Sequence, residues 1–134
     1  MGQMLCRGVR GATTVETNTA ETIREATAEL LQALVEANDI EHDRVASIVF
    51  TTTMDLNAAF PAVAARELGW TDIALLNTHE MAVPGALPRC IRILLHLNTE
   101  RSAREIKHIY LRDARKLRPD LVAQAGGWSE TLDR

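Results

Sequence analysis

The stretch Asn77-Thr78-His79-Glu80-Met81-Ala82-Val83-Pro84-Gly85-Ala86-Leu87-Pro88-Arg89-Cys90-Ile91-Arg92 links two apolar runs, and the rest of the chain is organised around it. It leaves one predicted strand, crosses a loop broken by proline and glycine, and enters a second predicted strand whose first outward side chain is Arg92. Glu80 and Arg92 should therefore lie at neighbouring strand ends. Opposite charges held there by a rigid scaffold suit a small polar ligand, although spacing alone favours a structural ion pair.

Length and composition predict a single domain over residues 1–134. The net charge is −3 with both signs interspersed, so we expect no general nucleic-acid-binding surface. Only Cys6 and Cys90 are cysteines, and no apolar run resembles a secretion signal or a membrane span, which favours a reducing, cytoplasmic setting away from membranes. The four histidines show no metal-ligand spacing, so no metal site is expected.

The spacing of apolar residues predicts one long helix and several short strands. The helix is expected between a cap at Asn18 or Thr19 and a stop at Asn38-Asp39, with its apolar stripe covering a sheet. A shorter helix is expected over residues 61–68. Strands are expected over residues 4–10, 45–52, 73–76, 90–97 and 106–111. The first strand would end at Gly11, the basic segment 112–121 is interpreted as solvated surface, and residues 122–134 as a mobile tail.

Two aromatic residues leave alternatives open. Phe60 precedes the short helix, where it is either a core residue or part of a pocket wall. Tyr110 shares a strand face with Ile106 and His108, so it is either a half-buried sheet tyrosine or a hydroxyl donor near a site.

Six segments, taken in chain order, resemble the AroH-type chorismate mutases, which are monofunctional and trimeric. The match extends from residue 5 to residue 121 without large insertions. The segments are Arg7-Gly-Val-Arg-Gly-Ala-Thr-Thr-Val-Glu16, Asp55-Leu-Asn-Ala-Ala-Phe-Pro-Ala62 with Arg66-Glu67-Leu68, Glu80-Met81, Cys90-Ile-Arg92, His108-Ile-Tyr-Leu111 and Leu117-Arg-Pro-Asp-Leu121. The fold that this resemblance implies is α+β, with a mixed sheet of about five strands covered by one long helix, and a trimer closed into a pseudo-α/β-barrel.

The activity that the resemblance implies is the Claisen rearrangement of chorismate to prephenate, which serves phenylalanine and tyrosine biosynthesis. Within one molecule a C–O bond breaks and a C–C bond forms, with no proton transfer and no nucleophile, so no cofactor is expected. Negative charge gathers on the ether oxygen in the transition state. A catalyst therefore needs fixed cations, hydrogen bonds to the substrate carboxylates and hydroxyl, and a tight cavity.

The resemblance also implies roles for individual residues. Arg92 looks like the arginine that faces the ether oxygen and a carboxylate, and Arg10 like the arginine that grips the side-chain carboxylate. Tyr110 would hydrogen-bond the same carboxylate as Arg10. Glu80 looks like the acceptor for the ring hydroxyl. Together Arg92, Glu80 and Arg10 form the expected catalytic set.

A wider substrate-binding set follows from the same resemblance. It adds Phe60, Ala62, Leu75, Leu76, Asn77, Thr78, His79 and Leu117 around the cavity, with Arg66 and Arg118 near its mouth. Asn77 replaces a cysteine of the best-known members, and its amide can both donate and accept hydrogen bonds. In the family each pocket forms between two subunits of a homotrimer, with the loop ending at Glu80 on one side and Arg10, Arg92 and Tyr110 on the other.

A function of another class is a trimeric binder that captures a small dicarboxylate without reaction, since architecture alone does not dictate activity. The joint presence of Arg10, Glu80, Arg92 and Tyr110 favours the enzyme, because a binder needs no cation at the ether position. RNA binding through the basic segment 112–118 is disfavoured, since it lacks interleaved aromatic residues.

Overall fold

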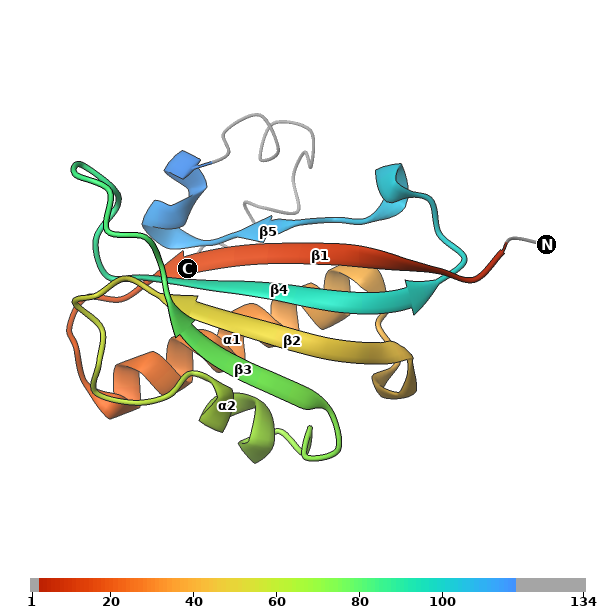
Figure 1. Ribbon diagram of the computed structural model, residues 1–134, viewed down its shortest axis with the longest axis horizontal. Coiled ribbons are helices and arrows are strands. Elements are labelled where there is room, and N and C mark those ends of the chain that lie inside the picture. The colour runs from red at the N-terminus through yellow and green to blue at the C-terminus, as the bar shows by residue number, and fades with distance from the viewer. Residues whose placement is uncertain (1–2, 118–134) are drawn as a thin grey trace.

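A computed structural model describes residues 3–117, which form a five-stranded sheet with helices packed on one of its faces (Figure 1). The elements in chain order are β1 (Leu5–Thr14), α1 (Ala20–Asn38), the 3-10 turn η1 (His42–Arg44), β2 (Val45–Thr52), α2 (Ala62–Glu67), β3 (Ala74–His79), β4 (Cys90–Thr99), η2 (Ala103–Glu105), β5 (Ile109–Tyr110) and η3 (Arg112–Leu117). This arrangement confirms the predicted α+β class.

The sheet is mixed, with strand order β3-β2-β4-β1-β5. Strand β4 pairs antiparallel with both β1 and β2, while the outer pairs β2–β3 and β1–β5 are parallel. The two long central strands that carry most of the pairing therefore come from opposite ends of the described chain (Figure 1).

Helix α1 matches its predicted boundaries because both ends carry specific caps. At its start the Thr19 hydroxyl accepts a hydrogen bond of 3.1 Å from the Thr22 N–H. At its end Asp39 adopts a left-handed conformation with φ of 49°, and its N–H donates to the Val35 carbonyl. The apolar stripe between these caps packs on the sheet and forms the main core with residues of β1, β2 and β4.

Strand β1 is longer than predicted, and Gly11 lies inside it rather than at its end. The reason is close packing. A Cβ atom at position 11 would lie 3.0 Å from both the Ile109 carbonyl oxygen and the Leu30 Cδ1 atom, so any side chain there would require β5 or α1 to shift. The missing side chain does not break the strand, because its backbone pairs on both sides.

Other predicted segments also differ from the structure. Strand β3 continues to His79, three residues beyond its predicted end at residue 76, because parallel pairing with β2 extends to Thr52. The last strand is confined to Ile109–Tyr110, whereas residues 106–111 were expected to be extended. The basic segment is also not simply solvated surface, since residues 112–117 form η3, whose Ala114 is buried against Ala12 and Tyr110.

Strand alternation divides the sheet into two faces. Side chains such as Phe50 and Ile93 point toward α1 and are fully buried. The alternate residues, including Thr51, Arg92 and Leu94, point to the opposite face. Most of this face is not covered by any helix of residues 3–117. We call this second side the open face.

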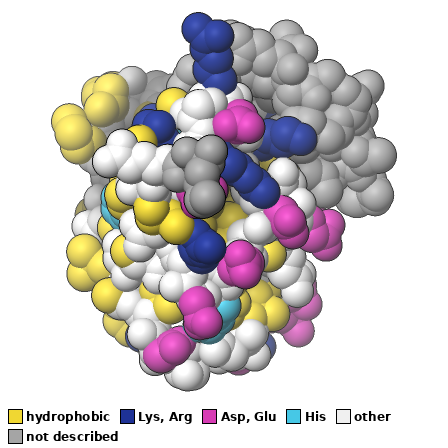
Figure 2. Space-filling view, turned by 90° about the vertical axis from the view of Figure 1, so that its right-hand side faces the viewer, with side chains coloured by type: hydrophobic (Ala, Val, Ile, Leu, Met, Phe, Trp, Pro, Cys, Tyr) yellow, Lys and Arg dark blue, Asp and Glu magenta, His cyan; other side chains and the backbone are white. Residues whose placement is uncertain are grey.

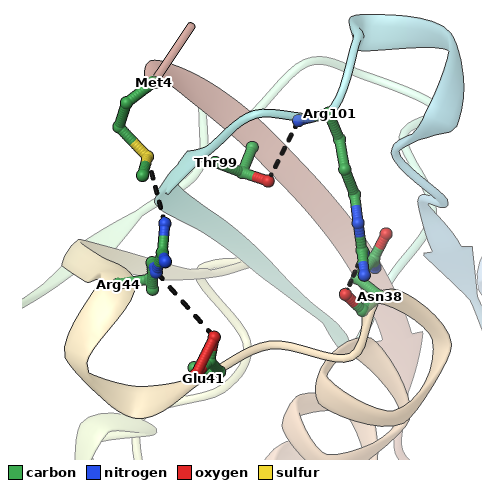
Figure 3. A network of polar contacts seen from close by, with 6 residues as sticks. All are labelled: Met4, Asn38, Glu41, Arg44, Thr99 and Arg101. Atoms are coloured by element: carbon green, nitrogen blue, oxygen red, sulfur yellow. Dashed lines mark hydrogen bonds and ion pairs between the residues drawn. The ribbon is translucent and has the colours of Figure 1, made fainter. Parts of the chain in front are cut away.

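At the end of the molecule near the N-terminus, polar contacts connect the chain segments that meet there. Arg101 donates to the Asn38 carbonyl at the end of α1, and Arg44 donates to the Met4 sulfur at 3.2 Å (Figure 3). Basic and acidic side chains are mixed across this end of the molecule (Figure 2). Among residues 3–117, no helix is long and apolar enough to cross a membrane.

Candidate active site

A cavity of ≈ 190 Å³ opens on the open face of the sheet, and four polar residues predicted from the sequence meet there. Its lining comprises Arg10, Gly11, Ala12, Thr51, Glu80, Arg92, Ile93, Leu94 and Tyr110. The structure thus brings Arg10, Glu80, Arg92 and Tyr110 together within one chain, although they come from widely separated positions in the sequence.

A transverse row with one residue from each strand crosses the sheet beneath this cavity, and four of its members, Thr51, Arg92, Ala12 and Tyr110, line the cavity. Across the sheet Thr78 of β3 pairs with Thr51 of β2, and Thr51 pairs with Arg92 of β4. Arg92 in turn pairs with Ala12 of β1, and Ala12 with Tyr110 of β5. Because directly paired residues of adjacent strands lie side by side on one face, the row places Arg92 at its centre, with the small Ala12 between Arg92 and Tyr110.

Glu80 reaches Arg92 by extending from the end of β3. Its N–H donates a hydrogen bond of 2.8 Å to the Thr52 carbonyl, which fixes the chain where it leaves the sheet. The Arg92 Nε atom then lies 3.7 Å from the Glu80 Oε2 atom, with both side chains a little over one third exposed. This distance is an ion pair rather than a hydrogen bond, and at such exposure the attraction is screened by water.

Two expectations about Glu80 are corrected by this geometry. Glu80 and Arg92 do not belong to neighbouring strands, because β2 lies between β3 and β4. The expectation that Glu80 would face Arg92 from across a subunit interface is wrong, since the two side chains line one cavity of the same chain. The sequence shows only that each residue lies near a strand end, and pairing order decides which ends meet.

Arg10 is oriented by the residues of β5. Its Nη2 atom donates a hydrogen bond of 2.9 Å to the Tyr110 hydroxyl oxygen, and its backbone N–H donates to Nδ1 of His108 at 3.0 Å. Tyr110 is only 4% exposed, so its ring is held by packing while its oxygen reaches the cavity. The Tyr110 hydrogen atom remains available to donate to a ligand that Arg10 also contacts.

Two polar atoms in the cavity lack a hydrogen-bond partner. Among the described side chains, the Nε atom of Arg92 and the Oγ1 atom of Thr51 are both buried without a hydrogen bond. Buried donors and acceptors are normally satisfied, and unpaired ones carry a desolvation cost. A polar ligand bound in this cavity could form the hydrogen bonds that these two adjacent groups lack. Sequence reasoning missed Thr51, because a threonine in a run of β-branched residues looks like an ordinary strand former.

Cys90 lies close enough to Arg92 and Glu80 for their charges to act on its thiol. Burial raises the pKa of its thiol above the ordinary value, and the nearby Arg92 guanidinium acts in the opposite direction. Cys90 packs with Ala12, Tyr110 and Ala114 in a small apolar cluster. Its neutral thiol is therefore a packing group beside the cavity residues Ala12 and Tyr110 rather than a nucleophile.

A second cavity, of ≈ 380 Å³, lies on the helix side of the sheet beside α2. Its lining includes Phe60, Asn77, Thr78 and His79, and Phe60 is 66% exposed. Phe60 is therefore a pocket residue rather than a core residue, which resolves the alternatives left open by the sequence.

Two polar residues of this second cavity already have hydrogen bonds within the chain. Asn77 uses its Oδ1 atom to accept a hydrogen bond of 2.9 Å from the Ala62 N–H at the start of α2, so a ligand contact would come from its Nδ2 group. His79 bonds to Thr52 through Nδ1.

The two cavities cannot combine within one chain, because they open on opposite faces of the same sheet. Asn77 points toward α2, while Arg92 points to the open face. Phe60, Asn77 and His79 are consequently not brought together with Arg10, Glu80 and Arg92 in the described chain. Thr78 lines the helix-side cavity although it also ends the transverse row.

The remaining predicted site residues occupy varied positions. Leu76 is exposed on β3, Leu75 packs against the main core, and Ala62 is fully buried in that core. Arg66 is exposed in the last turn of α2. Leu117 packs against the cluster that contains Tyr110. Arg118 lies outside the described residues.

The chemical character of the open-face cavity is that of fixed opposite charges and hydrogen-bond donors. Within residues 3–117, no group of three or more His, Cys, Asp or Glu side chains could hold a metal ion. Two guanidinium groups and a tyrosine hydroxyl can bind an anionic ligand, and Glu80 can accept from a ligand hydroxyl. Such a site can stabilise developing negative charge by position alone.

Comparisons with known proteins agree on one family. A model of the family described as chorismate mutase type I matches residues 6–121. A curated chorismate mutase AroH from Thermus thermophilus is 49% identical over 118 residues, which span 87% of this chain and 97% of the relative. The same-named protein of Bacillus subtilis (strain 168) is 42% identical over 119 residues, 88% of this chain and 94% of the relative. A solved chorismate mutase from Clostridium thermocellum is similar with a TM-score of 0.80 at 50% identity, covering 81% of this chain and 97% of that chain.

Proposed function

The chain belongs to the chorismate mutase type I family and is a chorismate mutase, an isomerase, and we propose that its reaction occurs at the open-face cavity, with Arg92, Glu80 and Arg10 as catalytic residues. Family membership implies chorismate as the substrate and a role in aromatic amino acid biosynthesis. The observation that carries the assignment of the site is the convergence of Arg10, Glu80, Arg92 and Tyr110 in one cavity of ≈ 190 Å³.

Arg92 supplies the positive charge for the transition state. Its Nε atom has no hydrogen-bond partner, and its place is at the centre of the transverse row. Both features suit a donor to the ether oxygen, on which negative charge develops as the C–O bond breaks. The strand fixes the guanidinium before the reaction begins, so little reorganisation is needed in the transition state. The contribution of Arg92 should therefore grow as the bond lengthens.

Arg10 and Tyr110 bind the side-chain carboxylate of chorismate. The 2.9 Å hydrogen bond from Arg10 to the Tyr110 hydroxyl holds both donors on the β1–β5 side of Arg92. A carboxylate there can accept from the guanidinium and from the tyrosine hydroxyl. This contact folds the enolpyruvyl arm over the ring, because Arg92 binds the ether oxygen of the same arm nearby.

Glu80 binds the ring hydroxyl of the substrate at the other end of the cavity. It lies on the β2–β3 side of Arg92, opposite to the carboxylate-binding pair. The ring hydroxyl can donate to its carboxylate while Arg92 keeps the pair electrically balanced. Arg10 and Tyr110 would thus hold one end of chorismate and Glu80 the other.

We also propose that the protein is a homotrimer in which each complete pocket forms between two chains. The second cavity, with Phe60, Asn77, Thr78 and His79, faces away from the charged cavity of its own chain, so the two can join only if one chain supplies each half. The open face also presents apolar residues such as exposed Leu76 and half-buried Leu94, which a neighbouring chain would cover. The free thiols Cys6 and Cys90 are in keeping with a cytoplasmic location.

The direct test is to mix the purified protein with chorismate and follow the loss of its ultraviolet absorbance. Prephenate is then identified by its acid-catalysed conversion to phenylpyruvate. Turnover should proceed without added nucleotide or metal. Persistence of chorismate at micromolar enzyme would instead favour a protein that binds a dicarboxylate without reaction.

A further inference from the structure

Thr51 places a hydroxyl group in the proposed active site, and no protein group in residues 3–117 satisfies it. Thr51 lines the charged cavity and lies directly opposite Arg92 in the antiparallel pairing of β2 with β4. Its Oγ1 atom is buried and has no hydrogen-bond partner. Burying a hydroxyl without a partner is unfavourable, so this position is expected to gain its hydrogen bond from something that enters the cavity.

The place of Thr51 in the transverse row indicates which part of a ligand it meets. Arg10 and Tyr110 lie on the β1–β5 side of Arg92, whereas Thr51 lies on the β2–β3 side. Glu80 occupies that same side, and its N–H is hydrogen-bonded to the carbonyl of Thr52, the residue after Thr51. Thr51 and Glu80 therefore serve the same end of the cavity, away from the carboxylate-binding pair.

We propose that Thr51 is a further substrate-contacting residue, whose hydroxyl donates a hydrogen bond to the ring hydroxyl oxygen of chorismate. A hydroxyl group donates one hydrogen bond and accepts up to two. The Glu80 carboxylate accepts a hydrogen bond from the ring hydroxyl, and the Thr51 hydroxyl donates a hydrogen bond to a lone pair on the same oxygen. This inference rests on the proposed function, since it requires the ring hydroxyl to lie beside Glu80.

The contact makes Thr51 a determinant of specificity rather than of bond breaking. The ring hydroxyl is present in the substrate and in the transition state, so its hydrogen bond stabilises the bound forms of both about equally. Loss of the contact should raise KM and leave kcat nearly unchanged. A ligand without the ring hydroxyl would leave the Thr51 hydroxyl unpaired, which is how a polar site discriminates against a deoxy analogue.

The first experiment compares Thr51→Val with Thr51→Ser. Valine has nearly the same shape, suits a strand and lacks only the hydroxyl, whereas serine keeps the hydroxyl and loses a methyl group. We expect Thr51→Val to raise KM for chorismate about three- to tenfold with kcat within about twofold of the parent. Thr51→Ser should restore most of the affinity. Equal losses in both variants would show that packing, not the hydroxyl, is responsible and would overturn the inference.

Thr13→Val is a matched control for the loss of a buried hydroxyl. Thr13 is fully buried, and its Oγ1 atom also lacks a hydrogen-bond partner, but it lies on the face of β1 that packs against α1. Its replacement should leave both kinetic constants unchanged. Neither valine variant should lower the melting temperature, because each removes an unpaired polar atom from the chain without substrate.

A second substrate isolates the contact. With an analogue of chorismate that lacks the ring hydroxyl, Thr51→Val and the parent should have the same kcat/KM within about twofold, because the analogue has no oxygen for Thr51 to contact. An equal loss with both substrates, or a fall in kcat alone, would mean that Thr51 acts through Arg92, and the inference would fail. Glu80→Gln distinguishes this failure from that of the proposed site. If Glu80→Gln impairs turnover and Thr51→Val does not, only the role of Thr51 is wrong.

Discussion

The Nε atom of Arg92 lies 3.7 Å from the Oε2 atom of Glu80 within a single chain, although β2 separates β4, which carries Arg92, from β3, which ends just before Glu80. The pair therefore exists before any assembly of subunits. Its members are brought together by the exit of the chain from β3 over the end of β2. This relationship decides how mutants of the two residues should behave.

Mixtures of inactive variants should recover activity only when the two lesions affect different halves of the pocket. Arg92→Ala and Glu80→Ala both damage the open-face cavity, so no mixture of these two should gain activity. Arg92→Ala mixed with Phe60→Asp should gain activity, because in a trimer about a quarter of the interfaces would combine two intact halves. The measurement is chorismate turnover after subunit exchange, with exchange verified by a size or mass tag. Recovery in the first mixture would contradict the placement of both residues in one half.

Replacement of Arg92 should reduce mainly kcat. Removing a preorganised donor to a developing oxyanion typically costs about 2.7–4 kcal/mol, or a few hundredfold in rate. Lysine in the Arg92→Lys variant should restore little of the lost rate, because an ammonium group cannot reproduce the planar fork of a guanidinium. Steady-state kinetics of both variants, with melting temperatures as a control for folding, would test this. A loss confined to KM would move the electrostatic centre of the site elsewhere.

The rate should depend little on pH between about pH 6 and pH 9, because arginine stays protonated throughout that range. No group in the proposed site has to exchange a proton during the rearrangement. The measurement is kcat at several pH values in buffers of constant ionic strength. A bell-shaped profile near neutrality would instead point to His79 or His108 as a participant.

Cys90 should resist thiol reagents that modify Cys6. Cys6 is exposed, whereas Cys90 is buried and burial raises the pKa of its thiol. At about pH 8 an alkylating reagent should modify one cysteine per native chain and both after unfolding. Peptide mass analysis would identify the modified residue, and modification of native Cys90 would contradict its burial.

The raised pKa of Cys90 also predicts how the free energy of unfolding should change with pH. An unfolded cysteine titrates near pH 8.5, so the folded state holds its proton more tightly than the unfolded state does. The stabilisation from burying the neutral thiol is present below about pH 8.5 and is lost as the pH rises toward the folded pKa. Denaturant unfolding at a series of alkaline pH values should show a steeper decline for the parent than for Cys90→Ala. Equal slopes would show that this thiol does not contribute.

The sequence predicts elements best where local chemistry decides them. Thr19 and Asp39 mark the ends of α1 because caps are local, and the β-branched run from Val45 to Thr52 is a strand along its full length. Gly11 misled the prediction for β1 because its function is to allow close approach to Leu30, a contact remote in sequence. The basic run at residues 112–117 likewise concealed the apolar contacts of η3.

The site is predictable only in part for the same reason. Motif resemblance identifies Arg10, Glu80, Arg92 and Tyr110, and the structure brings them together. It does not reveal that Glu80 and Arg92 share one cavity, since strand order depends on pairing across the whole chain. Thr51 carries no motif at all, and its candidacy depends on an unpaired atom that only coordinates can show.

The transverse row from Thr78 to Tyr110 makes the active site sensitive to small insertions and deletions. Each strand contributes one residue at the same level, and adjacent residues along a strand point to opposite faces. A single-residue insertion within β2 or β4 would therefore turn Thr51 or Arg92 toward the helices while leaving the composition of the strand almost unchanged. Length variation among functional relatives should consequently be confined to the connections between strands, such as the loop from Met81 to Arg89, and be absent from the strands themselves.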